Sequence, residues 1–181
     1  MASAAVLGLV VAAVMAVTPA MVSAGASGDE DSLRALALTM PVAGVEPSSL
    51  RDNYLEGRAG HPHAALDIAA ARGTPVRAVA DGRLVKLFTS RAGGLTVYQL
   101  DTQQRFFFYY AHLDHYAAGL HEGMALHRCD LIGYVGTTGN ALPDAPHLHF
   151  AVFVADPQKR WWQGTAINPF AAFAASASPG C

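Results

Sequence analysis

Charged residues are scarce in this chain of 181 residues: they make up 14% of it, against 52% for hydrophobic residues. The 12 Lys and Arg are outnumbered by 14 Asp and Glu, so the formal net charge is -2. A protein that binds nucleic acid usually carries a basic excess, and we therefore expect no nucleic-acid partner. The length suits one domain, and the apolar content is enough for a sizeable core.

Charge is missing altogether from the start of the chain, where Asp29 is the first charged residue. Residues 4–17 form an apolar run of the length found in signal peptides, and the small residues at 22–24 suit cleavage by a signal peptidase. We predict a signal peptide over residues 1–24. If it stays uncleaved, residues 4–22 would instead anchor the protein in a membrane. Both alternatives imply export, to the periplasm or cell envelope.

Cysteine is also rare, with Cys129 and Cys181 as the two examples. An exported protein lies where disulfides persist, so a bridge between them is allowed, but the sequence does not show that they meet. Cys181 ends a run of small residues, 171–181, that we expect to form a flexible tail.

Strand patterns dominate the middle of the chain. Residues 31–40 have apolar side chains at helical spacing before Pro41, which predicts a short helix in a linker over 25–40. The main domain is expected over 41–170, mostly β with an antiparallel sheet. Its expected strands are a hairpin over 75–88 around the Asp81-Gly82 turn, then 95–100, 105–112, 131–136 and 147–154.

Side chains alternate between the two faces of a strand, and this places histidines on the sheet. One face of 147–154 carries His147 and His149, while the other is wholly apolar and should lie on the core. On 105–112, alternation groups His112 with Phe106, Phe108 and Tyr110. If these two strands are neighbours, His112 joins the other two imidazoles in one groove.

A metal site is the strongest chemical hypothesis from the residues themselves. His63 and Asp67, together with the His147-His149 pair, supply two imidazoles and one carboxylate for a zinc ion and leave one imidazole beside it. Three protein ligands with the fourth position left to water are typical of a catalytic zinc site. His61, two residues from His63, is a weaker candidate for the same site.

Three ordered motifs resemble those of the lysostaphin-type zinc endopeptidases, which cut peptidoglycan peptides. They are His63-Ala64-Ala65-Leu66-Asp67, Tyr110-Ala111-His112-Leu113 and His147-Leu148-His149. The text between them, DIAAARGTPVRAVADGRLV over 67–85 and the glycine-rich approach over 132–150, is similar as well. The resemblance covers roughly residues 41–170.

The resemblance implies a role for each site residue. His63, Asp67 and His149 would hold one zinc ion per chain, and His112 and His147 would be the catalytic pair that handles protons and the oxyanion. The fold would be a small antiparallel β-sheet domain with a substrate groove, like a duplicated hybrid motif.

The same resemblance implies the substrate, which would be a peptide cross-link of bacterial peptidoglycan. The closing segment 159–170 resembles members from Gram-negative envelopes, so we expect the D-Ala–meso-diaminopimelate cross-link rather than glycine bridges. We expect a monomer. The alternative is a non-catalytic cell-wall-binding or amidase-activating module of the same fold, because some relatives lack the ligands.

The chain departs from the family pattern at four positions. Ala65 replaces a glycine, which is tolerable if the backbone there does not need a positive φ. Cys129 replaces the glycine before Asp130, and His61 stands where arginine is frequent. Ala151 stands where many members carry Glu, so an outer partner of the metal would differ.

Overall fold

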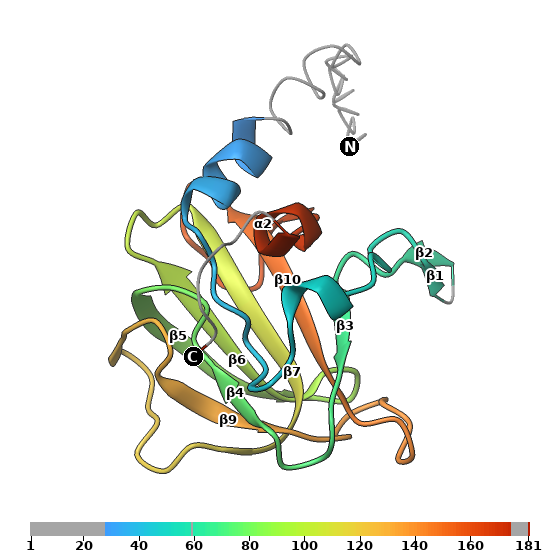
Figure 1. Ribbon diagram of the computed structural model, residues 1–181. Coiled ribbons are helices and arrows are strands. Elements are labelled where there is room, and N and C mark those ends of the chain that lie inside the picture. Colours follow the sequence, from blue (N-terminus) through green and yellow to red (C-terminus); the bar gives the residue numbers. More distant parts are fainter. Residues whose placement is uncertain (1–27, 59, 175–180) are drawn as a thin grey trace, which may run out of the picture.

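Figure 1 shows the computed structural model, which describes residues 28–58, 60–174 and 181. One antiparallel sheet dominates it. Six strands follow one another in the order β11-β10-β7-β6-β5-β8, while β3 pairs with β10, and β9 pairs with β7 and β4. The prediction of a mostly β, antiparallel fold is confirmed.

The strands of this sheet are β3 (Leu66–Ala69), β4 (Pro75–Arg77), β5 (Gly82–Ser90), β6 (Gly94–Asp101), β7 (Phe106–Tyr116), β8 (Ala125–Leu126), β9 (Leu131–Val135), β10 (His147–Ala155) and β11 (Gly164–Ile167). A small separate ribbon consists of β1 (Gly57–Arg58) and β2 (His61–Pro62). The short helices are η1 (Pro47–Ser49) and α2 (Phe170–Ala174).

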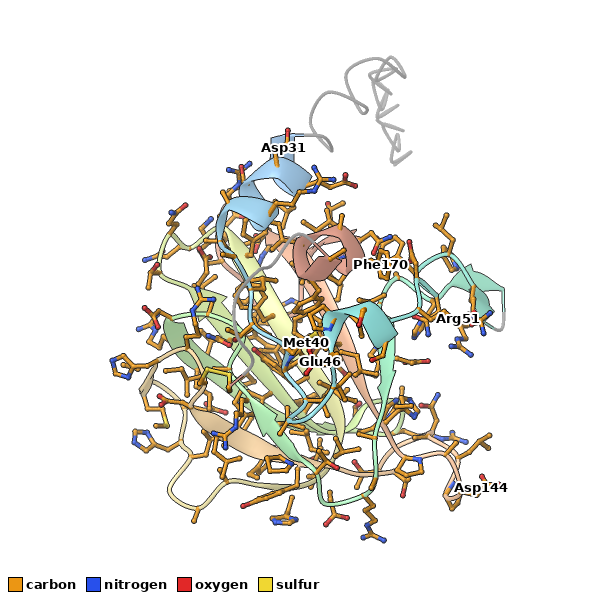
Figure 2. The ribbon with its side chains drawn as sticks, viewed as in Figure 1. Asp31, Met40, Glu46, Arg51, Asp144 and Phe170 are labelled. Carbon is orange, nitrogen blue, oxygen red and sulfur yellow. A yellow bond between two sulfur atoms is a disulfide. The ribbon has the colours of Figure 1, made fainter. Side chains whose placement is uncertain are left out.

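The core lies against one face of the sheet. The apolar face of β10 provides Leu148, Phe150 and Val152, each fully buried, as the alternation predicts. An extended segment crosses in front of this face with Met40 on it, and α2 closes one end of the core (Figures 1 and 2). The opposite face of β10 is left for the histidines.

Strands β7 and β10 are neighbours, with His149 opposite Ala111 and Phe150 opposite Tyr110. The predicted grouping of side chains on β7 is nevertheless wrong. Phe106, Phe108 and Tyr110 are all buried in the core, on the face away from the groove. His112 reaches the groove because an extra residue in β7 shifts its pairing with β6 between Leu95 and Val97, and His112 itself has φ 60.

The predicted hairpin over 75–88 is also wrong. Strand β4 pairs with β9, with Val76 opposite Gly133, while β5 pairs with β6 and β8. Residues between β4 and β5 pass from one pairing to the other, and Ala78 exchanges backbone bonds with Asp130 and Cys129. The local turn signal of Asp81-Gly82 is thus overridden by partners distant in sequence.

The N-terminal helix covers residues 28–35, earlier than the predicted 31–40. Ala37 has φ 48, which ends the helical path, and the Arg128 guanidinium donates to the carbonyls of Leu36 and Ala37. Residues from there to Val42 run extended across the core. Within the described residues, no helix is long and apolar enough to cross a membrane, and the predicted signal peptide or anchor over residues 1–24 lies outside them.

Both ends of the expected flexible tail, 171–181, are ordered in the structure, while residues 175–180 lie outside the described part of the chain. Helix α2 continues to Ala174 with Phe173 fully buried, and Cys181 forms a disulfide with Cys129. Cys129 has φ 72, the left-handed conformation that explains why related sequences place glycine there. A side chain in this conformation is strained. At this position the same side chain forms a disulfide with a residue 52 positions away.

We predict that Cys181→Ser lowers the free energy of unfolding by about 2–4 kcal/mol, since the unfolded chain loses a long closed loop. Urea unfolding of the oxidised protein measures this. Wild-type protein kept under a reducing agent is the control and should match the variant. Two free thiols in the oxidised native protein would contradict the bridge.

Candidate metal centre

The first motif is held in place by Asn53. The Asn53 carbonyl accepts a hydrogen bond from His63 Nδ1 at 3.1 Å, and its side-chain oxygen accepts one from the Asp67 backbone N–H at 3.2 Å. Between them Ala64 has φ 56, whereas Ala65 has an ordinary φ and is fully buried. The Ala65 substitution is therefore tolerated. No pattern in the sequence pointed to Asn53.

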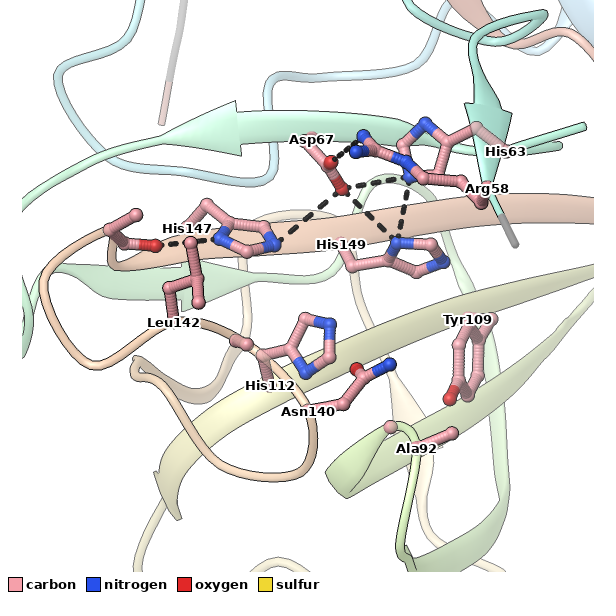
Figure 3. A pocket seen from close by; sticks show the side chains of 13 residues that line it. Arg58, His63, Asp67, Ala92, Tyr109, His112, Asn140, Leu142, His147 and His149 are labelled. Atoms are coloured by element: carbon pink, nitrogen blue, oxygen red, sulfur yellow. Dashed lines mark hydrogen bonds and ion pairs between the residues drawn. The ribbon is translucent and has the colours of Figure 1, made fainter.

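Three donor atoms converge above β3 and β10 (Figure 3). Asp67 Oδ1 lies 3.0 Å from His63 Nε2 and 3.1 Å from His149 Nδ1, and the two nitrogens are 3.1 Å apart. Tetrahedral ligands about 2.0 Å from a zinc ion lie about 3.3 Å from one another. The triangle therefore has the size of one face of such a site.

The chemistry of these atoms also calls for a cation. A carbonyl oxygen only accepts, so His63 donates Nδ1–H to Asn53 and turns the lone pair of Nε2 toward the triangle. Asp67 Oδ1 is a second acceptor at 3.0 Å. Burial alone would raise the pKa of Asp67, but the hydrogen bond and charge of His149, with His63 and His147, lower it to about 2. Asp67 is thus ionised, and a metal ion would satisfy both acceptors.

Arg58 adds a contact that sequence reasoning missed. It extends from β1, and its guanidinium donates to Asp67 Oδ2 at 2.7 Å. The two oxygens of the carboxylate are thereby divided, with Oδ2 on Arg58 and Oδ1 facing the histidines. Oδ1 is thus the oxygen left to bind a metal ion, and the contact of Arg58 with Oδ2 is of the kind that orients metal ligands.

His112 and His147 lie beside the triangle without belonging to it (Figure 3). Their rings are 5.0 Å apart, and His147 Nε2 is 3.6 Å from Asp67 Oδ1. Each Nδ1 is bonded at 2.8 Å to a backbone carbonyl, of Thr138 for His112 and of Ala145 for His147. Both rings therefore carry the proton on Nδ1 and expose Nε2 as the reactive nitrogen. Burial lowers the pKa of His112 to about 4.

The glycine-rich loop before β10 fixes the carbonyl that His112 uses. The Thr138 hydroxyl donates to the Leu113 carbonyl at 2.7 Å and accepts from the Leu95 N–H at 3.0 Å. Gly139, with φ 77, follows at a point where a Cβ would lie 2.3 Å from backbone atoms of residues 92–94. Only glycine allows this close approach, which couples the loop to the β5–β6 turn.

All five predicted site residues line one cavity of about 590 Å³. Cavities of this size accommodate small ligands or short peptides. Tyr109 was missed; it precedes Tyr110 in the strand and faces the opposite way, so the bulge in β7 gives the groove both Tyr109 and His112. The cavity is also lined by Arg58, Ala92, Gly93, Asn140, Ala141, Leu142 and Ala145.

Three other histidines whose side chains are described do not join the site. His115 bonds to Asp114, His121 to the Glu122 carbonyl, and His127 pairs with Asp130. The side chain of His61 lies outside the described residues.

Comparison with known proteins agrees with an antiparallel β fold that carries a peptidase site. The model of peptidase family M23 matches residues 61–169, more than half of the chain. The chain belongs to peptidase family M23.

Individual relatives are more distant. The chain is 29% identical over 104 residues to an L-Ala–D-Glu endopeptidase from Bacillus subtilis, which covers 55% of this chain and 32% of that protein. The catalytic domain of the antimicrobial peptidase lysostaphin from Staphylococcus simulans superposes with a TM-score of 0.57 at 25% identity, over 80% of this chain and 97% of that domain. Csd3 from Helicobacter pylori superposes with a TM-score of 0.57 at 27% identity, over 75% of this chain and 32% of Csd3. This chain thus spans about a third of the length of two of these relatives.

The donor triangle predicts that replacing His63, Asp67 or His149 by Ala sharply reduces bound metal. The loss should exceed the roughly 10- to 100-fold drop in affinity that removal of an outer partner causes. Elemental analysis of the purified chain measures occupancy. His121→Ala, distant from the triangle, is the control and should keep full occupancy. Undiminished metal in all three variants would contradict the assignment of these residues as metal ligands.

Proposed function

We propose that this protein is a zinc-dependent endopeptidase that hydrolyses peptide cross-links of bacterial peptidoglycan. The observation that carries the proposal is the arrangement of five side chains in one cavity. Three of them point donor atoms at one place, and two expose Nε2 beside it. Membership of a peptidase family supports hydrolysis as the reaction.

Zinc suits the donor set better than other common metals do. Magnesium and calcium prefer oxygen ligands, while two imidazoles with one carboxylate are a frequent zinc set. His63, Asp67 and His149 would hold one ion per chain. When bound, such an ion would polarise the scissile carbonyl and make water a nucleophile near neutral pH.

His112 and His147 would handle the protons. Because each Nδ1–H is bonded to a carbonyl, each Nε2 is the atom that takes or gives a proton. His112 is neutral at physiological pH, since burial lowers its pKa, so its Nε2 can accept the proton of the attacking water. A protonated imidazole can then return a proton to the leaving amine or bond the developing oxyanion.

The substrate would be an extended peptide lying along the cavity. Of the three relatives, the Bacillus subtilis enzyme is named for a bond, L-Ala–D-Glu, whereas lysostaphin is described as an antimicrobial peptidase. Support for the D-Ala–meso-diaminopimelate cross-link comes from the resemblance of residues 159–170 to Gram-negative members. We further propose that the mature protein acts in the periplasm or cell envelope, as a monomer, after removal of residues 1–24.

Replacing His112 or His147 by Ala should keep the metal but reduce turnover by roughly 10²–10⁴-fold, the usual contribution of a general acid or base. Metal content and cleavage rate are measured on the same preparation. A variant that held metal and cut at the wild-type rate would have no catalytic role at that position.

Purified cross-linked muropeptide dimers should be cut, and pentaglycine should stay intact, with a chelator abolishing cleavage. Mass spectrometry of the products identifies the bond. Metal-dependent cleavage of pentaglycine alone would reverse the choice of substrate. If neither substrate is cut, the alternative of a non-catalytic cell-wall-binding module is favoured.

N-terminal sequencing of the protein from its native host should find the mature chain starting at Gly25. An intact Met1 in the membrane fraction would favour the anchor over residues 4–22. An intact Met1 on a cytoplasmic product would contradict export.

A further inference from the structure

An aromatic surface continues from the cavity across the open face of the sheet. It consists of Tyr109, Tyr98, Trp161, Trp162 and Phe88. The ring of Tyr109 is 6.1 Å from that of His149 and 4.7 Å from that of Tyr98, which lies 4.9 Å from Trp161. Trp161 in turn is 5.4 Å from Trp162 and 5.2 Å from Phe88. The metal centre and the outermost rings are therefore joined by contiguous contacts.

The sheet and one loop build this surface. Tyr98 is directly opposite Tyr109, which is itself opposite Ala151 on β10. The loop between β10 and β11 brings Trp161 over the strands. Asp156 orders that loop, because its carboxylate accepts from the backbone N–H of Gln158 at 3.1 Å and from the backbone N–H and guanidinium of Arg160. The tryptophans are thus presented by an ordered turn.

The outermost side chains of the aromatic surface are exposed to solvent. Trp162 is 61% exposed and Phe88 is 40% exposed. Two other large apolar side chains are exposed among the described residues, Leu55 and the cavity residue Leu142. Trp162 and Phe88 both contact Trp161, which is joined to the cavity residue Tyr109 through Tyr98. A contiguous apolar patch with exposed members marks an interaction surface.

On the basis of the proposed function, we propose that this aromatic surface binds the glycan strand to which the substrate peptide is attached. The C–H faces of sugar rings pack flat on aromatic rings through dispersion and burial of apolar area. The indole N–H groups can donate to sugar hydroxyl and acetamido oxygens, and the hydroxyls of Tyr98 and Tyr109, which are hydrogen-bonded to each other, can add polar contacts.

The charges at the border favour sugar over the carboxylate-bearing peptide. Lys86, directly opposite Tyr98, is paired with Glu122 at 2.8 Å. Arg160, adjacent to Trp161, is paired with Asp156 at 3.0 Å. Both cations are already neutralised, so the surface offers stacking and hydrogen bonding rather than a positive field.

The length of the path agrees with this assignment. Four ring-to-ring steps separate His149 from Trp162, each between 4.7 and 6.1 Å. One residue of extended chain spans about 3.3–3.6 Å. Laid end to end, these steps correspond to at most about six residues of extended chain. A short peptide whose scissile bond lies at the metal centre can therefore bring its attached sugar to the tryptophans.

Direct binding is the first test, and it does not depend on bound metal or on turnover. Trp161 and Trp162 are the two tryptophans of the chain, so fluorescence excited selectively at tryptophan reports on this surface. Titration with peptide-free glycan strands, released from peptidoglycan by an amidase, should change the emission of the full chain. Trp162→Ala and Phe88→Ala should each weaken binding about tenfold, while Leu55→Ala should bind as wild type does. No binding by the wild type would overturn the proposal.

Cleavage separates this proposal from the function on which it rests. With cross-linked dimers that carry sugars, Trp162→Ala should lower kcat/KM about tenfold; with dimers stripped of sugars it should match the wild type. An equal loss on both substrates would assign Trp162 to the peptide instead and overturn the glycan assignment. Glycan binding that persists in a protein unable to cut either dimer would reject the peptidase proposal while supporting this one.

Discussion

The register of β10 between β3 and β7 is the constraint on which the site depends. It places His149 directly opposite Asp67 on one side and Ala111 on the other. Burial of Phe150 and its apolar neighbours fixes that register, because a slip by one residue would turn the core face outward and bury both histidines. The donors of the metal centre are therefore positioned by hydrophobic packing on the reverse side of the same strand.

The sequence predicts side-chain positions correctly on strands where the two faces alternate regularly. The prediction is wrong where a single extra residue interrupts the alternation. Alternation placed His147 and His149 correctly because β10 is regular throughout. It failed on β7, where the left-handed conformation of His112 moves one imidazole onto the face of Tyr109. Histidine adopts a positive φ more often than most residues do, but such cases are too few for its identity alone to predict one. The predicted hairpin around residues 81–82 is wrong for a different reason. Strand β4 pairs with β9, more than fifty residues away, and local turn residues do not reveal such a partner.

In the proposed function, the charges around Asp67 would have to serve both the binding of a cation and its activation. Among the described residues of the cavity, Asp67 is the carboxylate that faces the imidazoles. The Arg58 guanidinium donates a hydrogen bond to its second oxygen, Oδ2, at 2.7 Å. A carboxylate that shares its charge with a guanidinium is a weaker donor, so an ion bound there would keep more of its Lewis acidity. The neutral imidazoles of His63 and His112 act in the same direction, because they add no negative charge.

Ala151 lies where the cavity meets the aromatic surface. It is 1% exposed and lies opposite Tyr109, at a position where related sequences often have Glu. A carboxylate there would be buried beneath the first ring of the aromatic surface and would need a cationic partner. Alanine removes that charge and lets Tyr109 pack between His149 and Tyr98. Ala151 therefore leaves the junction between the cavity and the aromatic surface free of charge.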